Sequence, residues 1–222
     1  MRSEMARGDD RVVSELSAFW REAIHCRACP TIAPHRKFPP ASHGTARYRL
    51  MLIGEAPGRV SLENGRPFSN PRNLTIRSAF ARAVAPRAWE LEAVFYLTDV
   101  VKCWPASVNK ANRSPAANEI RTCVERHLKR ELDLVRPRLV LAFGALASSA
   151  ALGYRVRLAS VHGRPQVTET GMRVIPLLHP STANMRSLKQ AGILSIEDYE
   201  RGFSKILRSE LRRLVPLIER DF

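Results

Sequence analysis

Four cysteines are the residues best suited to chemistry in this chain of 222 residues, and their spacing is typical of a metal site. Cys26 and Cys29 are separated by two residues, the gap with which neighbouring thiolates bind one metal centre. Cys103 and Cys123 lie far along the chain. The even number fits one four-thiolate site that holds zinc or an iron–sulfur cluster. The alternative is a redox pair with two core cysteines, but no strand is expected before Cys26, and Pro30 follows the pair at once.

Polar segments form the second group of candidate functional residues. They cover residues 54–68, 99–112 and 179–186, and each directly follows a stretch that we expect to be a strand. Open α/β sheets bind their ligands in a crevice at the carboxyl ends of the strands. We therefore expect the three segments to meet in one site.

The elements that must position these segments alternate along the chain. Strands are expected at 48–53, 94–101, 138–143 and 172–178, and helices at 12–24, 74–84, 114–135, 144–152 and from Ser195 onward. Such alternation predicts an α/β fold with a parallel sheet covered on both faces. We expect an N-terminal tail at residues 1–10 and a single domain over residues 11–222.

The charge of the chain favours a polyanionic partner. Lys and Arg number 36 against 21 Asp and Glu, which gives a net charge of +15 and a sequence pI near 10.7. Neutralising phosphates releases condensed counterions, so this excess favours nucleic acid, although it does not separate DNA from RNA or acidic lipid. No apolar run reaches the roughly 18 residues of a membrane span, and charges occupy the place of a signal peptide. We expect a soluble intracellular monomer.

Four motifs in order make the pattern specific: GEAPG at 54–58, NGRPF at 64–68, TDVVKC at 98–103 and HPS at 179–181. Together they resemble the uracil-DNA glycosylase superfamily over about residues 20 to 215, and the four cysteines resemble its iron–sulfur branch, families four and five. The resemblance implies a three-layer α/β/α sandwich around a four-stranded parallel sheet and a structural [4Fe–4S] cluster, with zinc as the alternative. It also implies base-excision repair of DNA that contains a damaged base, in the cytoplasm and near the nucleoid.

The resemblance assigns roles in a pocket for a flipped base. Phe68 would form the stacking floor, and His179 would hydrogen-bond base O2 and stabilise charge as the glycosidic bond breaks. Glu55 and Asn109 are alternative residues for positioning the attacking water, because Ala56 stands where the best-known branch has an Asp. The remaining base-binding candidates are Gly54, Ala56, Pro57, Gly58 and Asp99.

Asp99 departs from the family pattern, in which many relatives have Asn. A protonated Asp could imitate an Asn amide toward uracil, whereas an ionised carboxyl suits cytosine-like edges. Asp99 could also face away from the base. Uracil is the first expectation, and a cytosine-like base or a deaminated purine is the alternative. The alternative from a different functional class is a non-catalytic module that carries the cluster and binds nucleic acid.

The DNA-contacting candidates combine basic side chains with a loop expected to enter the minor groove. We expect ordinary hydrolysis, with His162 in a structural or phosphate-contacting role. The candidates for DNA contact are Arg66, Arg72, Lys102, Lys110, Arg113, Ser181, Thr182, Asn184 and Arg186.

Overall fold

One mixed sheet forms the centre of the protein in the computed structural model, which describes residues 2–32, 35–70, 75–107, 111–180 and 184–221. Its strands are β1 (Leu50–Gly54), β2 (Tyr96–Asp99), β3 (Leu139–Phe143), β4 (Gln166–Val167) and β5 (Arg173–Leu177), in the order β2-β1-β3-β5-β4. The first three strands and β5 are parallel, as expected, and β4 pairs antiparallel with β5. The sheet therefore has five strands instead of the expected four. Two residues are too few to show an alternating pattern in the sequence.

The strands alternate between two apolar cores. Leu50, Leu52 and Leu141 belong to one core, whereas their neighbours Met51 and Val140 belong to the other. This alternation is the period of two that a strand imposes on its side chains. Because both faces are apolar, helices must cover both faces.

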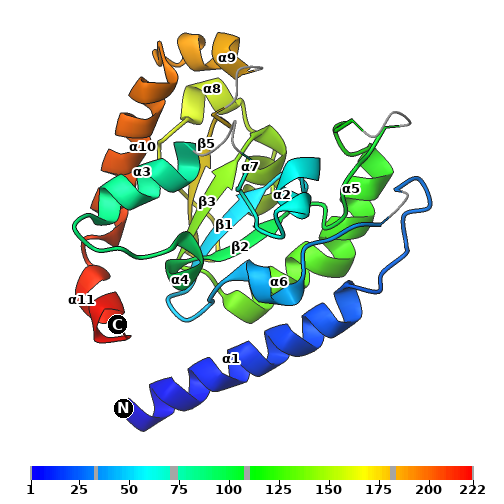
Figure 1. Ribbon diagram of the computed structural model, residues 1–222, viewed down its shortest axis with the longest axis horizontal. Coiled ribbons are helices and arrows are strands. Elements are labelled where there is room, and N and C mark those ends of the chain that lie inside the picture. Colours follow the sequence, from blue (N-terminus) through cyan, green and yellow to red (C-terminus); the bar gives the residue numbers. More distant parts are fainter. Residues whose placement is uncertain (1, 33–34, 71–74, 108–110, 181–183, 222) are drawn as a thin grey trace.

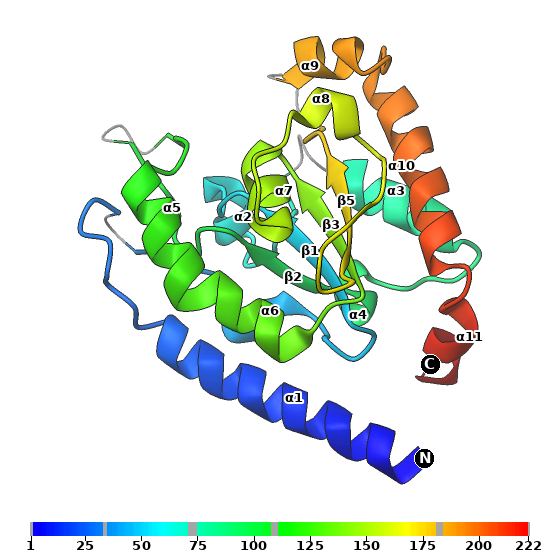
Figure 2. The same ribbon diagram turned by 180° about the vertical axis from the view of Figure 1, so that it is seen from behind.

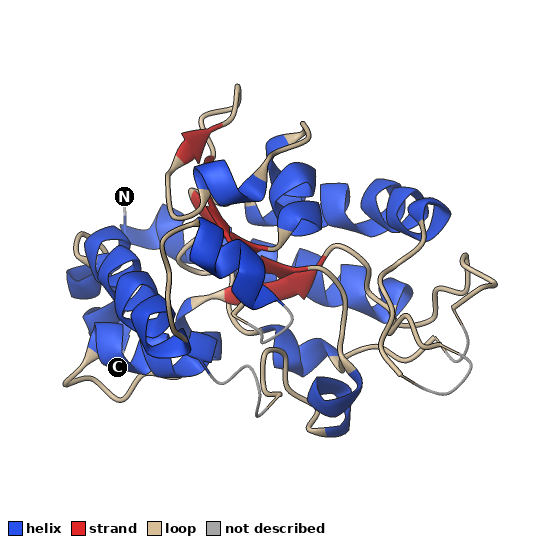
Figure 3. Cartoon of the chain, turned by 90° about the horizontal axis from the view of Figure 1, so that it is seen from above, coloured by secondary structure: helices blue, strands red, loops and turns tan. Residues whose placement is uncertain are grey.

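Two helical layers provide this cover (Figures 1 and 2). The first layer contains α3 (Thr75–Val84) and α10 (Ile196–Leu211), whose residues Phe80, Phe203 and Leu207 join the first core. The second contains α1 (Arg2–Ala23), α5 (Ala117–Cys123), the π-helix η3 (Val124–Leu128), α6 (Lys129–Val135) and α7 (Ala145–Leu152). Seen from above, helices lie on both sides of the strands (Figure 3). The expected α/β/α sandwich is confirmed.

Short helices complete the structure. They are η1 (Pro40–His43), α2 (Arg59–Glu63), α4 (Leu91–Val94), α8 (Leu158–Val161), α9 (Met185–Gln190), α11 (Val215–Ile218) and η5 (Glu219–Asp221). No helix among the described residues is both long enough and apolar enough to cross a membrane.

Helix starts were predicted with mixed success. Ser195 caps α10 as expected, because its hydroxyl accepts a hydrogen bond from the Asp198 amide at 3.1 Å. The helix expected from residue 114 begins instead at Ala117, since the Glu119 carboxylate accepts from the Ala116 amide and so takes the place of the Ser114 hydroxyl. The helix expected at 12–24 already begins at Arg2.

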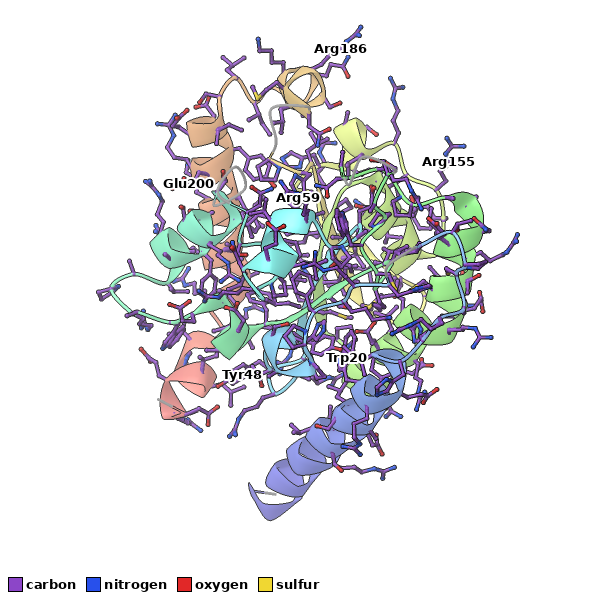
Figure 4. The ribbon with its side chains drawn as sticks, turned by 45° about the vertical axis from the view of Figure 1, so that its right-hand side comes forward. Trp20, Tyr48, Arg59, Arg155, Arg186 and Glu200 are labelled. Atoms are coloured by element: carbon purple, nitrogen blue, oxygen red, sulfur yellow. The ribbon has the colours of Figure 1, made fainter. Side chains whose placement is uncertain are left out.

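A buried polar network ties α6 to the sheet. Lys102 and Glu131 form an ion pair with side-chain exposures of 2% and 0%. Glu131 Oε1 also accepts from Tyr96 Oη at 2.7 Å and from Thr98 Oγ1 at 2.8 Å. Tyr96 Oη in turn accepts from Trp20 Nε1 at 2.9 Å, which adds the end of α1, where Trp20 lies against the body of the molecule (Figure 4). The network therefore joins three elements that are distant in the sequence.

Glu131→Gln should destabilise the protein by about 3–5 kcal/mol, because it leaves the Lys102 ammonium buried without a counter-charge. The matched control is Glu125→Gln, which breaks an exposed pair with Lys129 and should cost less than about 1 kcal/mol. Urea unfolding of both variants measures the difference. Equal midpoints would contradict the importance of the buried pair.

Candidate active site

A cavity of about 630 Å³ opens at the carboxyl edge of the parallel strands. It lies beside the neighbouring strands β1 and β3, where the order of the strands in the sheet changes direction. Doubly wound sheets bind their ligands at such a switch point. Segments after all four parallel strands contribute to it. Its sequence-predicted lining residues are Gly54, Glu55, Ala56, Pro57, Gly58, Phe68, Asp99, His179 and Asn184.

Gly54 allows two of these side chains to approach each other. It pairs with Asp99 in the register of β1 and β2. A Cβ atom at Gly54 would overlap Asp99 Oδ1 and would lie 3.2 Å from Phe68 Cζ. Only glycine fits here, because the carboxyl and the aromatic ring occupy the space of a side chain.

Phe68 is held in an uncommon backbone conformation. Its φ is +54°, in the left-handed region that bulky residues seldom adopt. The Arg77 guanidinium donates to the carbonyl oxygens of Pro67 at 2.6 Å and Phe68 at 3.2 Å, and it also pairs with Glu92. The Phe68 ring lies with its centroid 6.0 Å from that of Phe143. These contacts position the ring in the wall of the cavity.

Asp99 carries an unusual carboxyl group. Its side chain is buried, with 8% of the residue exposed, and burial raises the pKa of the carboxyl to about 7. The Lys102 charge lowers this pKa, and Glu131 and Glu55 raise it. No hydrogen bond to this carboxyl comes from the part of the chain that the structure describes. The group is therefore available to a ligand in the cavity.

His179 follows β5 and faces the same cavity. Burial lowers the pKa of its imidazole, so that the ring is neutral at pH 7 and carries one N–H donor. Asn184 Nδ2 donates to the His179 carbonyl at 3.1 Å, which ties the start of α9 to the segment after β5. Phe68 and His179, which the sequence assigned to one pocket, do lie around one cavity.

The loops after β1 and β2 are fastened together. The amides of Val100 and Val101 donate to the carbonyls of Gly54 at 2.9 Å and Glu55 at 3.0 Å. Asn112 Oδ1 accepts from Trp104 Nε1 at 2.8 Å and from the Arg59 amide at 3.1 Å. These bonds join the two segments that form this part of the cavity wall.

The sequence missed about half of the cavity lining. Phe143, Gly144 and Ala145 come from the end of β3, where the expected strand end and its glycine could have indicated them. Ser61 and Asn112 lie within the polar segments 54–68 and 99–112 that were expected to meet here, although neither was singled out. For the remaining residues the sequence carries no comparable signal. They are Phe38, Asn70, Leu158, Ala159, Leu178 and Ser187.

All four cysteines line a second, narrow cavity on the α5 side of the sheet. Burial raises the pKa of the Cys29 and Cys103 thiols, and it raises that of Cys123 to about 12. The Lys102 amide donates to Cys123 Sγ at 3.2 Å, the kind of hydrogen bond that tunes metal-bound thiolates. The π-helix η3 begins directly after Cys123, and such segments are frequent at functional sites.

The donor set fits a sulfur-bound metal group. Four thiols from three separate segments line one cavity, and the thiolates they form would need the positive charge of a metal to be stable when buried. Among the side chains that the structure describes, no three of Cys, His, Asp or Glu converge closely enough for a single metal ion.

Several predicted DNA contacts have other partners. The prediction that Lys102 contacts a phosphate was wrong. Its ammonium is buried against Glu131 and also donates to Thr98 Oγ1 at 2.8 Å. Arg113 pairs with the buried Glu119 at 2.6 Å, and Arg66 pairs with Glu92 at 2.9 Å.

Arg186 remains a free basic candidate: it is exposed and has no ion pair in the described ranges. It projects outward from α9 (Figure 4). His162 lies outside the cavity lining, where its Nδ1 accepts from the Leu178 amide at 3.0 Å. Five candidates lie outside the described residues: Arg72, Asn109, Lys110, Ser181 and Thr182.

The fold and the cavity define an α/β protein with a candidate ligand site at the carboxyl ends of its parallel strands. The model of the family described as the Uracil DNA glycosylase superfamily matches residues 41–201, and the chain belongs to this family.

Relatives named as glycosylases cover most of the chain. A type-4 uracil-DNA glycosylase of Thermotoga maritima is 29% identical over 182 residues, which are 82% of this chain and 89% of the relative. A type-4 uracil-DNA glycosylase of Archaeoglobus fulgidus is 26% identical over 84% of this chain and 88% of the relative. A type-5 uracil-DNA glycosylase of Pyrobaculum aerophilum is 29% identical over 81% and 86%. The resemblance seen in the motifs is confirmed.

Asp99→Asn should stabilise the protein, and more so at higher pH. Between pH 4 and 7 the folded wild type retains a proton that the unfolded chain has released, so its unfolding free energy falls as pH rises. The wild type should therefore lose on the order of 4 kcal/mol relative to Asn between pH 4 and 8, at about 1.4 kcal/mol per pKa unit. Urea unfolding across this range measures the difference, and parallel curves would contradict an elevated pKa.

Proposed function

We propose that the protein is a monofunctional DNA glycosylase that hydrolyses the N-glycosidic bond of uracil in DNA, in base-excision repair. One observation carries the proposal: Phe68, Asp99 and His179 line a single cavity at the carboxyl edge of the sheet. Membership of the superfamily and relatives named uracil-DNA glycosylases support the substrate.

The cavity suits a base that has left the duplex. A glycosidic bond inside stacked DNA is inaccessible, so the nucleotide must be extruded into a pocket. The Phe68 ring supplies a π-face on which the base stacks, and Gly54 leaves the room in which this ring and the Asp99 carboxyl lie side by side. A volume of about 630 Å³ lies in the usual range of ligand pockets, with room for the base and part of its sugar.

The proposed chemistry is hydrolysis assisted by charge stabilisation. As the bond breaks, negative charge develops on the leaving base, and the neutral imidazole of His179 donates its N–H to base O2. Glu55, the second residue of the GEAPG motif, positions the attacking water. Asn109 stays an alternative for that role and lies outside the described residues. Geometry and charge stabilisation supply much of the rate enhancement.

The net charge of +15 supports a polyanionic partner such as DNA, and binding to DNA would bring the protein to the chromosome. Arg186 is the best phosphate candidate, because it is exposed and close in sequence to the cavity residue Asn184. Arg66 and Arg113 form ion pairs with acidic side chains, so their contribution to phosphate binding is reduced.

The four cysteines would hold a [4Fe–4S] cluster, with zinc as the alternative. All four described thiols line one cavity, as the ligands of a single metal group must. The group would link the segment after α1, the end of β2 and helix α5 as a structural clamp.

His179→Ala should lower the single-turnover rate of uracil excision by about 10²–10³, the usual cost of losing one donor to a developing negative charge. Alkaline cleavage of a fluorescent oligonucleotide containing one uracil reports the rate. His162→Asn is the matched control and should stay within about threefold of wild type, because His162 lies outside the cavity lining. An unbroken strand with wild-type protein, together with tight binding, would show a binding module in place of an enzyme.

Cys123→Ser should abolish the brown colour that we expect of the purified protein, together with its iron and acid-labile sulfide. The neighbouring Thr122→Ser variant lines the same cavity without a thiol and should retain the colour. Metal analysis and visible absorption spectra measure both. One zinc per chain in colourless protein would assign the site to zinc.

A further inference from the structure

Asp99 is buried in the cavity wall, and its carboxyl is a candidate to bind a ligand there. It is more than nine-tenths buried and faces the cavity, and its carboxyl has no hydrogen-bond partner among the described residues. Its backbone carbonyl accepts a hydrogen bond from the ammonium of Lys102. Buried polar groups in folded proteins are nearly always hydrogen-bonded, so the missing partner of this carboxyl is best supplied by the bound substrate.

The position of Asp99 relative to Phe68 indicates which part of the substrate it meets. Both side chains lie on the side of Gly54 where other residues carry a Cβ atom. The Phe68 ring comes within 3.2 Å of that position, and the Asp99 carboxyl comes closer still. A planar base stacked on the Phe68 ring would therefore turn an edge toward the Asp99 carboxyl.

Among the described residues, Asp99 has no counter-ion of its own. Lys102 is the cation that acts on its carboxyl, and this ammonium is paired with Glu131 on α6. Glu55 after β1 adds a further negative charge. His179 after β5 lines the same cavity, and burial lowers the pKa of its imidazole, so it is neutral at pH 7. Burial without a free counter-ion favours an uncharged carboxyl.

We propose that Asp99 reads the extruded base as a neutral carboxylic acid, donating its O–H to O4 of uracil and accepting a hydrogen bond from N3–H. This inference rests on the proposed function and names the residue that selects the base. A neutral carboxyl offers one donor and one acceptor side by side, which matches this edge of uracil as an amide would. An ionised carboxylate has only acceptors, and it would repel O4.

The experiment compares wild type with Asp99→Asn, which has the same shape and no titrating proton. Single-turnover excision of uracil from an oligonucleotide is measured from pH 5.5 to 9. The wild-type rate should fall about tenfold per pH unit above roughly pH 7, because one proton is lost, and the Asn variant should lack this decline. Glu55→Gln is the control for the second carboxylate, and it should keep the decline whatever its absolute rate.

A readout that does not require excision separates this inference from the proposed function. Fluorescence of 2-aminopurine placed beside uracil in a duplex reports extrusion of the base. Extrusion should weaken above pH 7 in wild type and stay constant in Asp99→Asn. Excision by neither protein would refute the proposed function, and this fluorescence would still decide the role of Asp99.

Two outcomes would overturn the inference. The first is an identical pH dependence of wild type and Asp99→Asn in both readouts, including the absence of extrusion in both. The second is excision of cytosine in preference to uracil by wild type above pH 8, because that result would assign base reading to the ionised carboxylate.

Discussion

The buried ion pair between Lys102 and Glu131 is the interaction on which the rest of the structure depends. Removing two charges from water is costly, so the pair persists only because additional hydrogen bonds complete its surroundings. Those bonds come from Thr98 and Tyr96 on β2 and reach Trp20 on α1. One polar cluster thus holds α1 and α6 against the sheet.

The same lysine connects the two candidate sites. The Lys102 ammonium donates to the carbonyl of Asp99, in the wall of the large cavity. Its amide donates to Cys123 Sγ, in the cysteine cavity. The segment after β2 therefore joins the large cavity to the cysteine cavity, and a cofactor held by the cysteines would add rigidity to the wall that carries Asp99.

Gly54 imposes a second constraint, which is steric. The carboxyl of Asp99 and the ring of Phe68 fill the space that a side chain at this position would need. The pairing of Gly54 with Asp99 across β1 and β2 sets the lateral position of the carboxyl, and Arg77 holds the backbone at Phe68. The strand register and the loop hydrogen bonds together therefore shape the pocket.

The four parallel strands, the covering helices and the capping of α10 by Ser195 could be predicted from the residues, because periodicity and caps are local properties of a chain. The ends of the strands also predicted that GEAPG, Phe68, Asp99 and His179 would lie around one cavity. The two-residue strand β4 could not be predicted, because its pairing with β5 depends on a turn between them and not on a pattern of its own.

Tertiary structure alone decided the state of the charged groups. In the sequence, Lys102 lies in a basic, polar segment, which suggests a phosphate ligand. In the folded structure, α6 places Glu131 against its ammonium. Asp99 is an ordinary carboxyl in the sequence, and its pKa of about 7 arises from burial at the end of β2. Composition and spacing determine which elements form and in what order the motifs occur. Solvation and long-range charge contacts depend on the packing of segments distant in the chain, so the protonation and the partners of these residues follow from the folded structure.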